Sequence, residues 1–110
     1  MNPLIHGTLE SLILRTLHSE PRHGYGIARY LEEASADALQ VGEGSLYPAL
    51  YRMEKKGWID AEWRASELGR RAKFYRLTDD GRAQLARETA KWRAFADAVS
   101  RVLLPAGEHR

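Results

Sequence analysis

The segment from Gly44 to Trp58 carries the side chains with the clearest chemical potential in this sequence. On a helical wheel at about 100° per residue, Leu46, Leu50 and Met53 share one narrow stripe that would face a core. The opposite face holds Ser45, Pro48, Arg52 and Lys55. Tyr47 and Tyr51 lie on the flank between the two faces, where they would either bond DNA phosphates or pack against the preceding helix. Hydroxyl and cationic groups can bond the phosphates and base edges of a DNA major groove. We therefore predict a DNA-contacting helix here, and an ordinary solvated surface helix is the alternative.

A second set of cations lies in a stretch with the alternation of a β-hairpin. After Gly57 the apolar period changes from about 3.6 to about 2, because Ile59, Ala61 and Trp63 alternate with polar residues. Residues 66–71 form a turn-rich tip before a second strand. Basic residues outnumber the single acidic residue from position 64 to 76: they are Arg64, Arg70, Arg71, Lys73 and Arg76. A cationic hairpin tip suits a phosphate backbone or a minor groove, and a solvated turn is the alternative.

The elements that must position these groups begin with a helix at the amino terminus. Asn2 and Pro3 suit a helix cap and a first helical position, with Thr8 as the alternative cap. The helix carries an apolar stripe formed by Ile5, Leu9, Leu12, Ile13 and Leu17. Leu4 and Leu14 lie off this stripe, which indicates a second buried face.

A proline break at residues 20–22 ends this helix. Residues 23–26 lead into a second helix that ends near Ala34. Residues 38–41 are predicted to form a one-bridge strand before the Gly-Glu-Gly turn at 42–44.

The last helix is predicted to begin at a Thr78 cap, with Asp79 and Asp80 in its first turn, where carboxylates favour the positive end of the helix dipole. It runs to about Leu104 before Pro105, a length of about 39 Å. Apolar residues recur along it at Leu85, Trp92, Phe95, Val99 and Val102, with Glu88 interrupting the pattern. An apolar seam on a helix that outruns its domain predicts a dimer interface. Packing back onto the same domain is the alternative.

Composition narrows the classes of protein that fit. The chain has 110 residues, of which 44% are hydrophobic, so it can bury one modest core. A net charge of +2 excludes a strongly polybasic protein, so a nucleic-acid site must come from local clustering. The absence of cysteine excludes disulfides and thiolate zinc sites. No stretch has the length of a membrane span or the pattern of a signal peptide, so we expect a soluble cytoplasmic protein with no membrane partner.

The sequence offers no set of side chains for catalysis. Helix capping explains the adjacent Asp79 and Asp80, and the turn at 42–45 lacks the lysine of a phosphate-binding loop. The four histidines lack the spacing of a metal site: they are His6, His18, His23 and His109. We therefore predict no enzyme, no metal and no cofactor.

The order of the elements is more informative than any one of them. Helix, helix, central helix, hairpin and long helix predict a mainly α protein with a small β-hairpin wing. The fold would be a winged helix-turn-helix at residues 1–78, followed by a carboxy-terminal dimerisation helix and tail at 79–110. A winged-helix module that binds proteins instead of DNA is the alternative. Such modules tend to lose the cations that this chain keeps at Arg52, Lys55, Arg70, Arg71 and Lys73.

The sequence resembles the PadR family of bacterial transcriptional regulators, in the short form with one carboxy-terminal helix. Four runs carry the resemblance: His-Gly-Tyr-Gly-Ile at 23–27, Gly-Ser-Leu-Tyr-Pro-Ala-Leu at 44–50, the run to Gly57, and the wing from Gly69 to Gly81. The Gly-Glu-Gly at 42–44 departs from the commoner proline-containing turn, so the start of the central helix stays open.

This resemblance implies a homodimer on an inverted-repeat operator, usually a repressor of adjacent detoxification or transport genes. The central helix would enter the major groove, and the wing would contact the backbone or the minor groove. Short members often bind planar aromatic molecules at the dimer interface, and Trp92 is the matching position.

The other aromatic and apolar side chains are predicted to support the fold or the dimer. Tyr25 would seat the second helix, with contact to DNA phosphate as the alternative, while Trp63, Tyr75 and Leu77 belong to the core. The dimer and effector residues would be Leu4, Ile5, Leu14, Trp92, Phe95, Val99 and Val102. Two Trp92 indoles facing across a two-fold axis would either stack or leave a slot for a flat aromatic effector.

Overall fold

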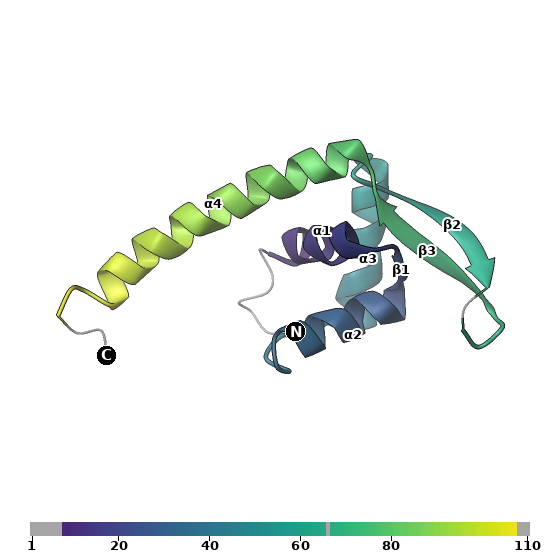
Figure 1. The fold of residues 1–110 in the computed structure, drawn as a ribbon, viewed down its shortest axis with the longest axis horizontal. Coiled ribbons are helices and arrows are strands. Elements are labelled where there is room, and N and C mark those ends of the chain that lie inside the picture. Colours follow the sequence, from purple (N-terminus) through teal and green to yellow (C-terminus); the bar gives the residue numbers. More distant parts are fainter. Residues whose placement is uncertain (1–7, 66, 108–110) are drawn as a thin grey trace.

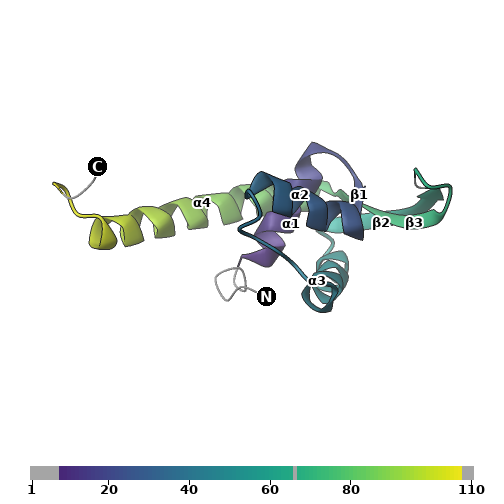
Figure 2. The ribbon, with the colours of Figure 1, turned by 90° about the horizontal axis from the view of Figure 1, so that it is seen from below.

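The elements follow the predicted order in this computed structural model, which describes residues 8–65 and 67–107 (Figure 1). They are α1 (Leu9–Ser19), β1 (Arg22–His23), α2 (Gly24–Ala34), α3 (Glu43–Lys55), β2 (Ile59–Ala65), β3 (Arg71–Leu77) and α4 (Asp79–Leu103). The described chain is mainly helical with one small antiparallel sheet, so the predicted fold class is confirmed. In both views α4 and the β2–β3 hairpin extend from the other helices in opposite directions (Figures 1 and 2).

The core lies where α1, α2 and α3 meet the base of the sheet. Its fully buried apolar side chains include Ile13, Leu14, Ile27, Leu46, Leu50, Met53 and Ile59. Burying one such side chain stabilises the fold by about 1.5–3 kcal/mol. The predicted inward stripe of α3 is confirmed, and Ala49 joins it. Tyr75 and Leu77 are buried as predicted.

Leu14, predicted as a dimer and effector residue, is buried within its own protomer. Its side chain is 0% exposed, because α1 packs against α2, α3, β3 and α4 of the same protomer. The second buried face of α1 is therefore internal to the protomer, and Leu14 belongs to the protomer's own core instead of a surface that meets a partner chain. The Asn2–Pro3 helix start, Leu4 and Ile5 lie outside the described residues; α1 has Thr8 at its N-cap position.

The sheet has the order β1-β3-β2 and is antiparallel throughout. The predicted hairpin is confirmed, with Ile59 opposite Leu77 and Trp63 opposite Lys73. The sequence pattern does not predict β1, whose two residues pair with β3. The strand predicted at 38–41 is wrong: this segment is a loop, and β3 already has a neighbouring strand on each edge.

The direction of α4 is set at its first turn. The Thr78 hydroxyl accepts a hydrogen bond from the Gly81 amide at 3.0 Å and donates one to the Gly57 carbonyl at 2.6 Å. The predicted cap is thus confirmed. A side chain at position 81 would overlap the Trp58 carbonyl, so glycine lets α4 cross this turn closely.

Only the first part of α4 packs on its own domain. Leu85 is buried, and Glu88 accepts a hydrogen bond from the Ser11 hydroxyl of α1 at 3.1 Å. The later part of α4 extends past the other helices (Figure 1), and its Trp92 and Phe95 side chains are exposed. Packing onto the same domain is therefore confirmed for the first part of α4, and the dimer interface stays a prediction for the exposed part. No helix among the described residues is both long and apolar enough to cross a membrane.

Candidate nucleic-acid interface

The outward side of α3 is an exposed face, centred on Gly44, Pro48, Tyr51 and Lys55. Tyr51 is 61% exposed and belongs to this face instead of its flank, with Lys55 Nζ 5.2 Å from its ring centroid. Ser45 is only half-exposed and lies toward α1. The face thus offers a phenol, a cation and open backbone to a ligand.

The start of α3 resolves the open question about the Gly-Glu-Gly turn. The helix begins at Glu43 with Gly42 as its N-cap, and the Gly42 carbonyl accepts hydrogen bonds from the Ser45 and Leu46 amides. A side chain at Gly42 or Gly44 would meet nothing within 4 Å. Because these glycines add no bulk, a nucleic-acid backbone could approach this end of α3 closely.

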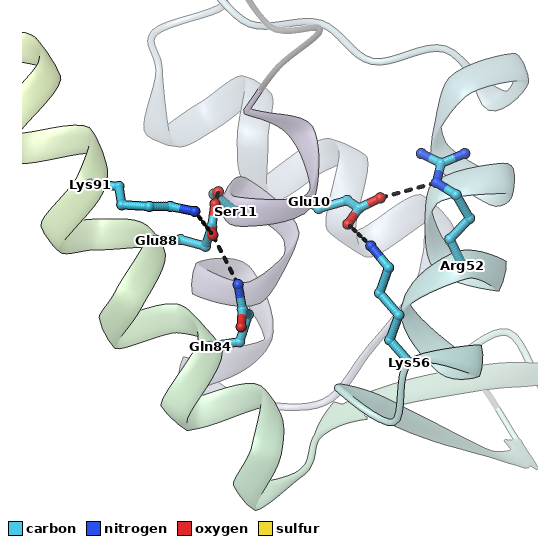
Figure 3. A network of polar contacts seen from close by, with 7 residues as sticks. All are labelled: Glu10, Ser11, Arg52, Lys56, Gln84, Glu88 and Lys91. Atoms are coloured by element: carbon cyan, nitrogen blue, oxygen red, sulfur yellow. Dashed lines mark hydrogen bonds and ion pairs between the residues drawn. The ribbon is translucent and has the colours of Figure 1, made fainter.

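The flank of α3 toward α1 carries Arg52. Its Nε donates a hydrogen bond to Glu10 at 3.0 Å, and Lys56 Nζ donates to the same carboxylate at 3.1 Å (Figure 3). This flank borders a cleft of about 480 Å³ between α1, α3 and the early turns of α4. Arg52, predicted to contact DNA, therefore lies at the edge of the exposed face and already has one partner.

The opposite flank of α3 faces α2 and the wing. The Tyr47 ring packs against Gly24 at the start of α2. Glu54 accepts a hydrogen bond from Lys73 Nζ of β3 at 3.0 Å. That hydrogen bond raises the pKa of Lys73, against the opposing effect of burial. Lys73, predicted as a DNA contact, is thus partly committed within the protomer and ties the wing to α3.

An open groove of about 1140 Å³ separates the start of α2 and Tyr47 from the hairpin. At its α2 side, His23 caps the helix by accepting a hydrogen bond from the Gly26 amide at 3.0 Å. Tyr25 is 65% exposed here, so its predicted role in seating α2 is wrong. Its hydroxyl instead accepts a hydrogen bond from Arg29 at 3.1 Å. This bond is the main cause that raises the pKa of Arg29, and the hydrogen bond that Arg29 donates to Glu33 is the next.

Trp63 lines the same groove and is 60% exposed, so its assignment to the core is wrong. The alternation of β2 placed it on the same side as buried Ile59. That side loses its cover along the strand, because Ile59 is buried, Ala61 is half-buried and Trp63 is open. Alternation in the sequence predicts the face of the strand on which a side chain lies. Where the helices that cover this face end depends on the tertiary fold.

The wing tip presents Arg70 and Arg71 to solvent. Neither forms an ion pair with another residue in the described parts of the chain. Two other wing arginines have partners within the protomer: Arg64 lies 4.0 Å from the Phe74 ring centroid, and Arg76 pairs with Asp60 at 2.7 Å. Arg29, Arg70, Arg71, Tyr25, Tyr47 and Trp63 therefore border one groove, while Arg52 lies on the other flank of α3.

Known proteins are similar to this chain in sequence and in fold. The model of the transcriptional regulator PadR-like family matches residues 13–87. A transcriptional regulator of Mycobacterium tuberculosis is 33% identical over 90 residues, which cover 82% of this chain and 80% of that protein. The crystal structure of a PadR-like transcriptional regulator from Bacillus cereus has a TM-score of 0.80 and 34% identity, covering 92% of this chain and 96% of that one. A PadR family transcription regulator from Clostridium difficile has a TM-score of 0.77 and 31% identity, with 88% and 99% covered.

Proposed function

Because this chain belongs to the PadR-like family of transcriptional regulators, we propose that it binds an inverted-repeat DNA operator as a homodimer and represses adjacent genes. Members of the family are regulators of transcription and not enzymes. In this proposal, residues of α3 and the wing contact DNA, two copies associate through α4, and a small aromatic effector releases the dimer from DNA.

The observation that carries the proposal is the position of α3 between two cationic flanks. Its open face presents Tyr51 and Lys55. Arg52 lies on one flank, and the groove bordered by Arg70 and Arg71 lies on the other. A helix of this kind fits a major groove, while cations at its sides meet the phosphates that border that groove.

Each residue set has a distinct role in this arrangement. Ser45, Pro48 and Arg52 face base edges, and Lys55 and Tyr51 lie within reach of bases or phosphates. Tyr25, Tyr47 and Lys73 border the path of one DNA strand between α3 and the wing. Arg70 and Arg71 contact the backbone or the minor groove from the wing tip.

The exposed end of α4 supports association of two copies. Trp92, Phe95, Val102, Leu103 and Leu104 are all exposed large apolar residues, and soluble monomers seldom expose such a surface without a partner. Residues 79–110 would then serve as the dimerisation helix and tail, and residues 1–78 as the DNA-binding part. Two-fold pairing through α4 would place the two recognition helices on symmetric half-sites.

A small aromatic effector is a second element of the proposal. The Trp92 and Phe95 rings lie 6.0 Å apart and tilt by 47° on the exposed part of α4. Facing indoles in a dimer would leave a slot for a planar guest. A guest there would alter the angle between the long helices, and so the spacing of the recognition helices.

The experiment that tests the function is selection of duplex DNA from a random library by the full chain. We expect enrichment of one near-palindrome, and repression of a reporter gene placed behind that site. A chain that enriches no sequence but captures a protein partner would instead be a winged-helix interaction module.

A further inference from the structure

Glu10 of α1 pairs with Arg52 of α3 and with Lys56, the residue that follows α3, at the edge of the exposed face of α3. Its Oε2 accepts from Arg52 Nε and its Oε1 accepts from Lys56 Nζ, so both carboxylate oxygens are occupied (Figure 3). The Glu10 side chain is 24% exposed, against 54% for Arg52. Solvent-exposed ion pairs add little to stability, so the main consequence of this contact is the geometry that it imposes on Arg52.

The turn of α1 that carries Glu10 is packed against other elements. Its neighbours Leu9 and Ile13 are buried in the core. The adjacent Ser11 donates a hydrogen bond to Glu88 on α4, and Glu88 also accepts from Gln84 at 2.8 Å. The first turn of α1 is therefore fixed to α4 on one side and to α3 on the other, as Figure 3 shows. A guanidinium held from this turn has a defined orientation.

The pairing leaves one edge of the Arg52 guanidinium open. Its Nε is used by Glu10, whereas Nη1 and Nη2 bond no side chain or carbonyl within residues 8–65 and 67–107. In Figure 3 the one dashed line between Glu10 and Arg52 ends at Nε, and none is drawn to the two terminal nitrogens. Two parallel N–H donors of this kind match O6 and N7 of guanine in the major groove. Because Lys56 adds a second cation, the cluster keeps a net positive charge that favours DNA.

We propose that Glu10 is a positioning residue for base reading: it fixes Arg52 so that Nη1 and Nη2 meet a guanine in each half-site. This inference rests on the proposed DNA-binding function and deepens it, since it assigns a G·C pair to the α1 flank of the recognition helix. The competing mechanism is simple repulsion, in which the Glu10 carboxylate weakens binding to any DNA because it lies near phosphates.

The test compares Glu10→Gln, Arg52→Ala and the double variant with the parent chain, on the DNA that the parent selects from a random library. Each G·C pair of that site is replaced in turn, and Kd is measured for every protein at one salt concentration. Asp60→Asn is the matched control, because Asp60 also pairs with an arginine Nε but lies on the far face of the wing hairpin. Thermal unfolding of each variant checks that it is folded.

For Arg52→Ala, replacing one particular G·C pair should no longer change Kd. Glu10→Gln should weaken discrimination at that same pair by roughly fivefold to tenfold, within the range that one bidentate base contact supplies. The double variant should be no worse than Arg52→Ala, since the two residues act as one unit. Asp60→Asn should keep the full preference.

Two results would overturn the inference. If Glu10→Gln raises affinity for all sequences alike, as loss of a repulsive charge would, Glu10 is only a competitor. If it lowers affinity for all sequences alike, its role is structural. Failure of the parent to enrich any sequence would instead contradict the proposed function itself, so the two failures are distinguishable.

Discussion

The phenol of Tyr47 lies so close to the α-carbon of Gly24 that a methyl group at position 24 would overlap its ring and hydroxyl. This contact joins the first residue of α2 to α3, so a larger residue at position 24 would push these two helices apart. We expect Gly24→Ala to destabilise the fold by about 1–3 kcal/mol, the usual cost of overpacking, and to weaken DNA binding as α3 shifts.

Gly26→Ala is the matched control, measured by urea unfolding, because a methyl group there would make only ordinary contacts at 3.5 Å with the His23 ring. Adding Tyr47→Ala to Gly24→Ala should recover part of the lost stability, since it removes the overlapping ring. A Gly24→Ala variant as stable as Gly26→Ala would show that Tyr47 moves aside freely.

The wing arginines should contribute affinity without sequence preference. A dimer that neutralises roughly eight phosphates gives a slope of about −7 in log affinity against log salt, and losing four of those contacts should reduce its magnitude by about 3.6. Arg70→Ala/Arg71→Ala should therefore weaken binding to cognate and random DNA equally, as measured by fluorescence anisotropy across a salt series. Arg82→Ala/Arg87→Ala removes the same charge from α4 and should leave the slope near its original value. A double wing variant that lost only cognate binding would assign base reading to the wing.

Trp63 should matter for DNA binding and little for folding. Because its indole is mostly exposed beside the groove, Trp63→Ala should change the free energy of unfolding by less than about 1 kcal/mol. Its Kd for DNA should rise by roughly fivefold, equivalent to about 1 kcal/mol. Unfolding and binding measured on the same preparation separate these effects. A loss of stability near 3–5 kcal/mol is typical of a buried tryptophan and would show that Trp63 belongs to the core.

The exposed Trp92 should govern the response to aromatic molecules. We expect Trp92→Ala to remain dimeric by light scattering, because Phe95, Val99 and Val102 remain on the same helix, and to bind the operator. It should no longer bind a planar acridine dye in the absence of DNA. Trp63→Ala, which removes an exposed indole from the wing, should still bind the dye. If Trp92→Ala falls to monomers, or the parent binds no planar dye, Trp92 is a dimer anchor and the effector proposal fails.

Local patterns in the sequence predicted most of the fold. The stripe of Leu46, Leu50 and Met53, the cap at Thr78 and the alternation from Ile59 each depend on neighbours within one or two turns, so the sequence alone shows them. The two-residue strand β1 is too short to have a pattern of its own and exists only because β3 offers an edge.

The residues that the sequence misplaced depend on packing between distant segments. The pattern predicts a second buried face at Leu14, but it does not show that four other elements of the same protomer bury this residue. Trp63 follows a buried alternation yet extends beyond the cover of the helices. The contact between Glu10 and Arg52 joins residues 42 positions apart, and neither periodicity nor composition carries information about such a pair.

A footprint of the full chain on the DNA that it selects, combined with the protein-to-DNA ratio of the complex, shows directly whether two copies bind an inverted repeat. A two-fold dimer should protect two half-sites of inverted sequence, about one helical turn or more apart, with two chains bound to one duplex. Protection of a single half-site at every protein concentration, with one chain per duplex, would contradict it.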